Sequence, residues 1–359
     1  MRLPQVVGIA CLLYMVMLPV SVQAQFTFTT NADNTITIMA YTGRDADVAV
    51  PDTINGLPVT SIGDYAFYDC LSLTNVTIGT NVTGIGNGTF FDCLGLTSVT
   101  IPNGVTSIGV AAFGWCGLSS VMIPNSVTSI GNSAFDACGN LASVTLSDSV
   151  TNLGDGAFEY CPSLTSIVIP NSVARLGVND FYGCASLTNV AIPNSITNIG
   201  DVAFAYCTSL TSVTIPCGVT SIGNGTFEFC TNLEGIFFNG NAPSFVASDI
   251  FYDTLNVTVY YLPGTTGWDT TFAGRPTAFW LLPYPTILNF EPDFGVQTNS
   301  FGFTISWATN LSVVVEASTN LSNPVWQPVQ TNLLTTGSAW FSDPQCTNYP
   351  ARFYRLRSP

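Results

Sequence analysis

A repeating pattern of apolar and polar residues occupies most of this chain. Eight segments, each about 23 residues long, carry a Phe that is followed three residues later by a Cys. The pairs are Phe67 and Cys70, Phe90 and Cys93, Phe113 and Cys116, Phe135 and Cys138, Phe158 and Cys161, Phe181 and Cys184, Phe204 and Cys207, and Phe227 and Cys230. A short, nearly constant period is typical of stacked coils that contact only their neighbours. The pattern therefore predicts an elongated solenoid.

Two extended pieces are expected in each coil. Residues 164–169, Leu-Thr-Ser-Ile-Val-Ile, alternate with a period of two, which predicts a strand, and the strands of successive coils should stack in parallel. A Pro ends this strand in five repeats, and a second short extended piece such as residues 127–130 follows. About eight apolar side chains per coil cannot offset the entropy of ordering 23 residues, so neighbouring coils must complete the core.

In six repeats an Asp or Asn lies three positions before the repeat Phe. We expect its side chain to cap the first turn of a short helix or 3₁₀ segment. Calcium binding is the alternative, but calcium needs several oxygens converging from one loop. The capping residues are Asp64, Asn87, Asn132, Asp155, Asp201 and Asn224. The third repeat is one residue shorter between Cys116 and Leu118, and we expect this deletion at an exposed turn with the core register kept.

These repeats resemble the BspA-like leucine-rich repeats, whose pattern is Leu-x-x-Ile/Val-x-Ile-Pro-x-x-Val-x-x-Ile-Gly-x-x-Ala-Phe-x-x-Cys. The resemblance covers about residues 48–241, and residues 25–47 resemble the β-hairpin cap at the start of such arrays. It implies a mainly β leucine-rich-repeat solenoid of about eight coils, with parallel strands and short helical or 3₁₀ turns. It also implies a secreted or surface-displayed protein that adheres to proteins or host surfaces.

The first 24 residues are typical of a cleaved secretory signal. They contain one early Arg2, an apolar stretch at about 6–20 and the small residue Ala24 before the cleavage point. A membrane anchor is the alternative, but the apolar stretch is short and Pro19 closes it. Lipid attachment at Cys11 is disfavoured because apolar residues follow it. No later segment is long and apolar enough to span a bilayer, so we expect a secreted or cell-surface protein.

Composition excludes much catalytic chemistry. The chain has no His and no Lys, and its seven Arg stand against 22 acidic residues, for a net charge of −15. Without His there is no imidazole base and no ordinary zinc site, and without Lys there is no Schiff base. The negative charge repels phosphate backbones, which excludes nucleic acid as a partner. We expect a non-enzymatic protein with no catalytic residues, no cofactor and no metal.

The cysteine column is expected to consist of buried free thiols. Neighbours in a parallel stack lie about 4.8 Å apart with side chains pointing the same way, whereas a disulfide needs converging Cβ atoms about 3.8 Å apart. Occasional pairing of neighbours is the alternative, and zinc is disfavoured because no C-x-x-C occurs. Cys217 and Cys346 lie outside the column and are either bridged to each other or unpaired.

Two surfaces are candidate binding faces for a protein or a surface glycan. The first is the row of outward positions on the main strands, although Ser and Thr also suit exposed strands in general. It comprises Asn75, Thr77, Ser98, Thr100, Ser120, Met122, Ser143, Thr145, Ser166, Asn189, Ser212 and Thr214. The second is aromatic, and packing over a helix edge is its alternative. It comprises Tyr68, Phe91, Trp115, Tyr160, Tyr182, Tyr206 and Phe229. Nearby acids are not gathered into a cleft, which argues against a glycosidase.

The repeat pattern decays after residue 241. Residues 242–280 are expected to form a terminal coil and cap, and the Pro-containing residues 281–297 a linker. The alternation in residues 298–359 predicts a small β-sandwich, which resembles the C-terminal β-modules of other secreted bacterial repeat proteins. Its last segment carries Arg352, Arg355 and Arg357, which mark either a docking or export signal or a protected edge strand.

The leading interpretation is an exported, non-enzymatic recognition or adhesion scaffold that uses the solenoid face. One alternative is a carbohydrate-binding or polysaccharide-associated surface protein, for which the aromatic set matters most. The other is a structural protein of the cell envelope. The sequence itself does not name the partner, because small polar residues are interchangeable in such scaffolds.

Overall fold

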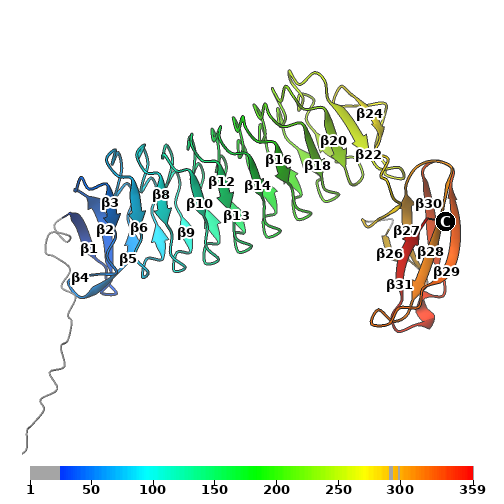
Figure 1. The fold of residues 1–359 in the computed structure, drawn as a ribbon, viewed down its shortest axis with the longest axis horizontal. Helices are drawn as coiled ribbons and strands as arrows, with labels where there is room; N and C mark the ends of the chain where they lie inside the picture. The colour runs from blue at the N-terminus through cyan, green and yellow to red at the C-terminus, as the bar shows by residue number, and fades with distance from the viewer. Residues whose placement is uncertain (1–24, 291–293, 298–299, 359) are drawn as a thin grey trace, which may run out of the picture.

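The computed structural model describes residues 25–290, 294–297 and 300–358, and the expected signal at 1–24 lies outside them. This part of the chain forms a long solenoid followed by an antiparallel β-module (Figure 1). The fold is mainly β, as the repeat pattern predicts. Within the described residues the only helical element is the short 3₁₀ helix η1 (Cys346–Asn348), and no helix there has the length and apolarity to cross a membrane.

Each coil contributes one main strand and one shorter second strand to the solenoid. Alternate residues of the main strand point inward, so Val76 is buried between the more exposed Asn75 and Thr77. The main strands are β3 (Asp47–Ala49), β6 (Asn75–Thr77), β8 (Ser98–Thr100), β10 (Ser120–Met122), β12 (Ser143–Thr145), β14 (Ser166–Val168), β16 (Asn189–Ala191), β18 (Ser212–Ile215), β20 (Gly235–Phe238) and β22 (Thr258–Tyr261). Paired main strands run parallel, with equivalent residues opposite each other.

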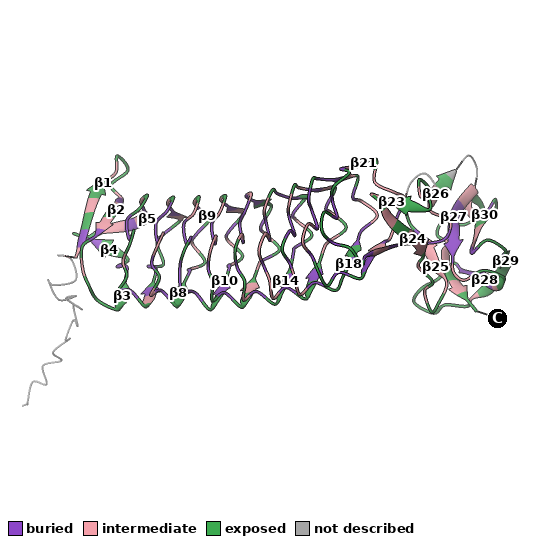
Figure 2. Cartoon of the chain, turned by 90° about the horizontal axis from the view of Figure 1, so that it is seen from above, coloured by how far each residue is buried: buried purple, intermediate pink, exposed green. Residues whose placement is uncertain are grey.

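The second strands form parallel ladders of their own on another side of the solenoid. They are β5 (Leu57–Ile62), β7 (Gly84–Ile85), β9 (Ser107–Ile108), β11 (Ser129–Ile130), β13 (Asn152–Leu153), β15 (Arg175–Leu176), β17 (Asn198–Ile199), β19 (Ser221–Ile222) and β21 (Phe245–Val246). Seen from above, the coils follow one another at regular intervals along the rod (Figure 2). This regularity keeps chemically equivalent side chains in continuous rows.

Phe and Cys side chains fill the centre of the solenoid. The eight Phe residues of the repeats are fully buried, and neighbouring rings stack with centroids 4.9–5.9 Å apart. All eight column cysteines are free; seven are buried and Cys70 is half-buried. Each buried thiol donates to the Phe carbonyl of the preceding coil, with Sγ to O distances of 3.0–3.3 Å. The column therefore hydrogen-bonds each coil to its neighbour.

The expectation of short helical turns around the Ala-Phe pair is wrong for the solenoid as described. The residues two before and two after each Phe are left-handed, with φ between 50° and 72°. N–H groups of this segment donate to the next coil; Phe67 N, for example, donates to Thr89 O at 2.8 Å. Because these donors are used between coils, they are not free for the bonds within a segment that a helix requires.

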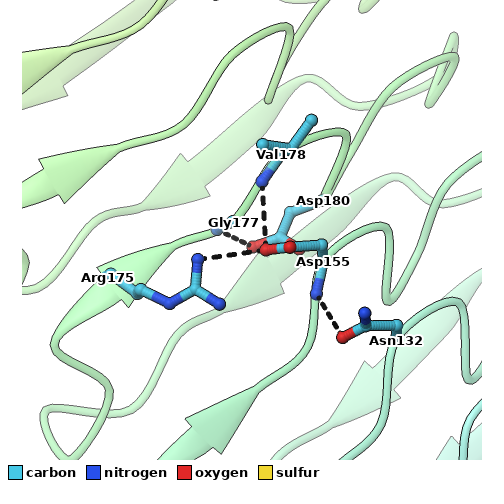
Figure 3. A network of polar contacts seen from close by, with 6 residues as sticks. All are labelled: Asn132, Asp155, Arg175, Gly177, Val178 and Asp180. Carbon is cyan, nitrogen blue, oxygen red and sulfur yellow. Dashed lines mark hydrogen bonds and ion pairs between the residues drawn. The ribbon is translucent and has the colours of Figure 1, made fainter.

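Five of the six polar residues that were expected to cap helices, all but Asn224, instead link adjacent coils. Asp64 Oδ1 accepts a hydrogen bond from Asn87 N at 2.7 Å, and Asn87 Oδ1 accepts one from Val110 N at 2.8 Å. Figure 3 shows the same arrangement further along, where Asn132 accepts from Asp155 N at 3.1 Å and Asp155 accepts from Val178 N at 3.3 Å. These side chains satisfy backbone donors at the coil junctions.

The short third coil keeps its place in the core. Ile108 remains opposite Ile130 in the second-strand ladder, and the Phe113 and Phe135 rings stack at 5.3 Å. Gly117 lies at the shortened turn, where a Cβ would clash with the backbone oxygen Leu94 O of the preceding coil. Beside this coil the main sheet is divided, because β8 and β10 form no ladder and only Ser119 N reaches Thr97 O, at 3.4 Å; β16 and β18 also form no ladder, although their coil has the ordinary length.

Both ends of the solenoid carry extra strands. At the start, β1 (Phe26–Thr30) and β2 (Ile36–Tyr41) form an antiparallel hairpin that adds to β5, and β4 (Thr53–Ile54) pairs with the other end of β5. At the far end, β24 (Arg275–Phe279) adds to β22 and pairs with β23 (Thr271–Phe272). These strands cover apolar coil surfaces that have no further repeat to pack against.

The C-terminal module has two antiparallel sheets that share one apolar core. One sheet holds β25 (Thr286–Leu288), β26 (Phe294–Gln297), β27 (Ser300–Ser306) and β30 (Ser338–Asp343). The other holds β28 (Leu311–Ser318), β29 (Gln327–Leu334) and β31 (Phe353–Arg357). The expectation of a linker at 281–297 is wrong, because β25 and β26 both pair with β27 and so belong to the module. The Pro residues of this segment made its strand pattern hard to recognise in the sequence.

Candidate functional site

The outward row of the main strands forms a continuous surface, which we call the main-sheet face. All but one of the positions expected there are exposed, and Asn75 is half-buried. The face is more apolar than expected, because Met122 is 72% exposed and Val168 is 70% exposed in the same row as Thr100 and Thr145. Val168 was missed as a face residue, although its register in the repeat places it there.

The main-sheet face also continues beyond the residues expected from the sequence. Phe237 and Tyr260 occupy the same row in the last two coils, and their rings stack at 4.8 Å. No Asp, Glu or Arg occupies an outward position from β6 to β22. The result is a long, uncharged and partly apolar surface on a protein whose net charge is −15.

A hollow of about 620 Å³ interrupts the main-sheet face at the short coil. It lies where β8 and β10 fail to pair, and Met122, Thr100 and Thr145 belong to its lining. Val99, whose equivalents in most other coils are buried, is half-buried in this lining. The short coil therefore lies beside a recessed position of the main-sheet face, whose lining also includes the exposed Asp148.

The aromatic set expected from the sequence is divided by the structure. Tyr160, Tyr182, Tyr206 and Phe229 form a continuous row with Tyr252, and successive ring centroids are 4.6–5.7 Å apart. Nearer the start of the chain, the ring centroid of Tyr68 lies 6.1 Å from that of Phe91 and 6.1 Å from that of Tyr65. Tyr65 and Tyr252 were missed, although both stand next to the repeating Ala-Phe segment.

Trp115 stands apart from both aromatic groups. Ala137 occupies the equivalent position of the next coil, so a hollow of about 420 Å³ opens between Trp115 and Tyr160. Asp136 and Glu159 also line it. Burial raises the pKa of both carboxyls, and the charge of Asp136 raises that of Glu159 further.

The column cysteines have the properties of structural residues. Burial raises the pKa of Cys138, Cys184 and Cys230 to about 12, so these thiols stay neutral and unreactive at ordinary pH. Among the described residues, no three His, Cys, Asp or Glu side chains are grouped in a way that would hold a metal ion.

The terminal Arg residues are held within the C-terminal module. Arg355 and Arg357 contact opposite oxygens of the buried Glu316, with N to O distances of 2.7 and 2.8 Å. Arg352 contacts Asp343 at 2.9 Å. These ion pairs tie β31 to its neighbours and leave Arg355 and Arg357 about half exposed.

Comparisons with known proteins agree with this architecture. The family model for the BspA type leucine rich repeat region (6 copies) matches residues 60–177 and 151–270. A leucine-rich repeat protein of T. pallidum is 33% identical, over 52% of this chain and 88% of that one, with a TM-score of 0.50. One from Bacteroides ovatus is 29% identical, over 66% of this chain and 70% of that one, with a TM-score of 0.53. Curated proteins give no significant match. The chain belongs to the BspA-type leucine-rich repeat family.

Proposed function

We propose that this chain is an exported, non-enzymatic recognition or adhesion protein that binds a partner protein through its main-sheet face. Membership of a family of repeat scaffolds supports an interaction role, and the signal-like first 24 residues support export. In this arrangement the solenoid presents the surface, and the C-terminal module joins it to a second component of the cell surface.

The observation that carries the proposal is the character of the main-sheet face. Cores of protein interfaces are depleted in charged residues and enriched in large apolar ones. The face follows this rule, since it is uncharged from β6 to β22 and exposes Met122 and Val168. The hollow at Met122 provides a recessed position of the kind into which a partner's anchor side chain packs.

Site-specific photo-crosslinking on intact cells tests the proposal. A photoreactive phenylalanine is placed at Val168, on the face, and in a control protein at Asn152, which is also exposed but lies on the second-strand side. We expect one defined protein adduct from Val168 and none from Asn152. Equal labelling from the two positions would contradict the use of this face.

Quantitative binding to the purified adduct partner then tests the surface itself. The double change Ser143→Asp and Thr145→Asp places two charges on the face without touching the core. We expect it to weaken binding at least tenfold, because unpaired charges buried in an interface are costly. The matched change Asn152→Asp should leave binding unchanged.

A carbohydrate-binding role is the second candidate, and the aromatic row from Tyr160 to Tyr252 favours it. Exposed rings provide stacking surfaces for sugars as well as for proteins. Glycan-array binding that disappears in Tyr206→Ala and Tyr252→Ala, two exposed members of the row, would support this role over the first. Assembly of the purified protein into sheets would instead indicate a structural envelope protein.

A further inference from the structure

Seven of the eight repeats carry an aromatic residue one or two positions after the repeat Phe, and the fourth repeat carries none. The residue two positions after the repeat Phe is aromatic in Trp115, Tyr160, Tyr206 and Phe229, and it is left-handed in each case. In the fourth coil this residue is Ala137, with φ 55°. The missing ring creates the hollow of about 420 Å³ between Trp115 and Tyr160, a volume in the usual range for small-ligand sites of about 300–1,000 Å³.

The lining of this hollow is acidic and has no positive group to balance it. Asp136 and Glu159 are its two charged residues, and they repel each other. Glu159 receives only a neutral hydrogen bond, from Asn179 Nδ2 at 3.3 Å, and Asp136 Oδ1 is buried without a partner. Arg175, the one Arg of the eight repeats, is paired with Asp155 at 3.0 Å.

The chemistry of the hollow fits a cation better than a sugar. A cationic group is attracted to the faces of Trp and Tyr and forms charge-assisted hydrogen bonds with carboxylates. The backbone N–H groups of Trp115 and Ala137 already donate to Asp136 O and Glu159 O at 2.7 and 2.8 Å, so the donors left in the lining are the Trp115 indole N–H and the Tyr160 hydroxyl, beside two carboxylates that favour a positive charge. Both charged side chains of the lining are acceptors when ionised.

We propose that the hollow above Ala137 binds an Arg or Lys side chain of a partner protein, with the cation held between the Trp115 and Tyr160 rings and paired with Asp136 and Glu159. The site lies among the Ala-Phe turns, away from the outward row of the main strands. It therefore adds a second contact to the proposed function and does not depend on the main-sheet face.

The test uses the full chain labelled with 5-fluorotryptophan and observed by ¹⁹F NMR. Six Trp signals are expected, and Trp115→Phe identifies the one in the hollow. The probes are N-acetylarginine amide and N-acetyllysine amide; neutral N-acetylnorleucine amide and cellobiose are the controls. We expect the cationic probes to shift the Trp115 signal in a saturable way and the neutral probes to leave it unchanged.

Three variants separate the site from general charge effects. The double variant Asp136→Asn with Glu159→Gln should bind the arginine probe about fivefold more weakly or worse, because it removes the two negative charges that pair with the cation. Ala137→Tyr should abolish binding by filling the gap, and Tyr160 and Tyr206 show that this backbone position accepts Tyr. Glu228→Gln, on the same side in a coil without the gap, should have no effect.

Several results would overturn the proposal. They are an equal shift with the norleucine amide, a shift with cellobiose but not with the arginine probe, no shift up to the solubility limit, or unchanged binding in Ala137→Tyr. Circular dichroism confirms that each variant is folded. Because this assay does not involve Val168 or Ser143, its failure leaves the crosslinking test of the main-sheet face intact, and the converse also holds.

Discussion

Asp180 occupies a position of the repeat at which an acid is unexpected. The residue just before the repeat Phe is Ala in five coils and Thr in two, and in every coil it is buried. Thr89 satisfies its hydroxyl there by donating to Gly86 O at 2.9 Å. Asp180 is also completely buried; its Oδ2 accepts from Gly177 N at 2.6 Å, and its Oδ1 has no partner (Figure 3).

The Asp180 carboxyl disturbs the ladder of second strands. In neighbouring coils the equivalent Gly donates to the preceding strand, as Gly154 N does to Ile130 O at 2.9 Å and Gly200 N to Leu176 O at 3.0 Å. Gly177 N donates to Asp180 instead. The ladder is interrupted at this point, since β13 ends one sheet and β15 begins another.

We predict that Asp180→Ala stabilises the solenoid, and more so at higher pH. Burial raises the pKa of Asp180 from 3.8 to about 7. The folded state therefore keeps a proton that the unfolded state releases, and stability falls as the pH rises from about 4 to about 7. A shift of this size corresponds to about 4 kcal/mol, of which roughly 3 kcal/mol falls between pH 5 and pH 8.

Urea unfolding of the native chain and of Asp180→Ala at pH 5 and pH 8, followed by circular dichroism, measures this effect. The advantage of the variant should grow by about 3 kcal/mol between the two pH values. Asp148→Ala, which removes an exposed acid from the preceding coil, is the control and should show no such trend. Hydrogen exchange should also reveal new protection of Gly177 N in Asp180→Ala. An advantage that is independent of pH would refute the reasoning.

Three further predictions follow from the core, the thiols and the C-terminal module. Phe158→Ala removes a fully buried ring that stacks on both sides, so urea unfolding should show a loss of about 3–5 kcal/mol. Hydrogen bonds from Arg357 and Arg355 lower the pKa of Glu316, so their stabilisation is present at neutral pH and fades as the pH falls through that lowered value. Glu316→Gln should therefore lower the melting temperature at pH 7, with a difference that shrinks in acid. In a thiol-labelling experiment mapped by mass spectrometry, the seven buried column thiols should react only in denaturant, and the fast-reacting residues of the described chain should be Cys70, Cys217 and Cys346.

The repeat pattern was enough to predict the solenoid and the family, because the position of each Phe and Cys records which residues contact their counterparts one coil away. The same register predicted which main-strand side chains point outward. It did not predict the form of the turns, since Asp and Asn next to a short apolar segment also match a helix cap. Their actual acceptor role, as between Asp64 and Asn87 N, requires the next coil to be in place.

The candidate sites depended still more on the stacking. The sequence shows an aromatic residue next to several Phe positions, but not that Tyr160 to Tyr252 form one row or that Trp115 is isolated by Ala137. Likewise, the sequence shows a one-residue deletion in the third repeat, but not that a hollow lined by Met122 lies beside it, where β8 and β10 form no ladder. In both cases the hollow is formed by residues of adjacent coils, which only the stacked structure brings together.

The sequence by itself determined the coil length, the buried columns and the absence of His and Lys chemistry, because these follow from residue type and spacing alone. Only the tertiary structure decided which acceptors the backbone N–H groups bond to, which aromatic rings stack, and which carboxyl oxygens are buried without a hydrogen-bond partner. The physical reason is that each of these outcomes is a competition between partners within a coil and partners in the adjacent coil, and stacking brings the second set within reach.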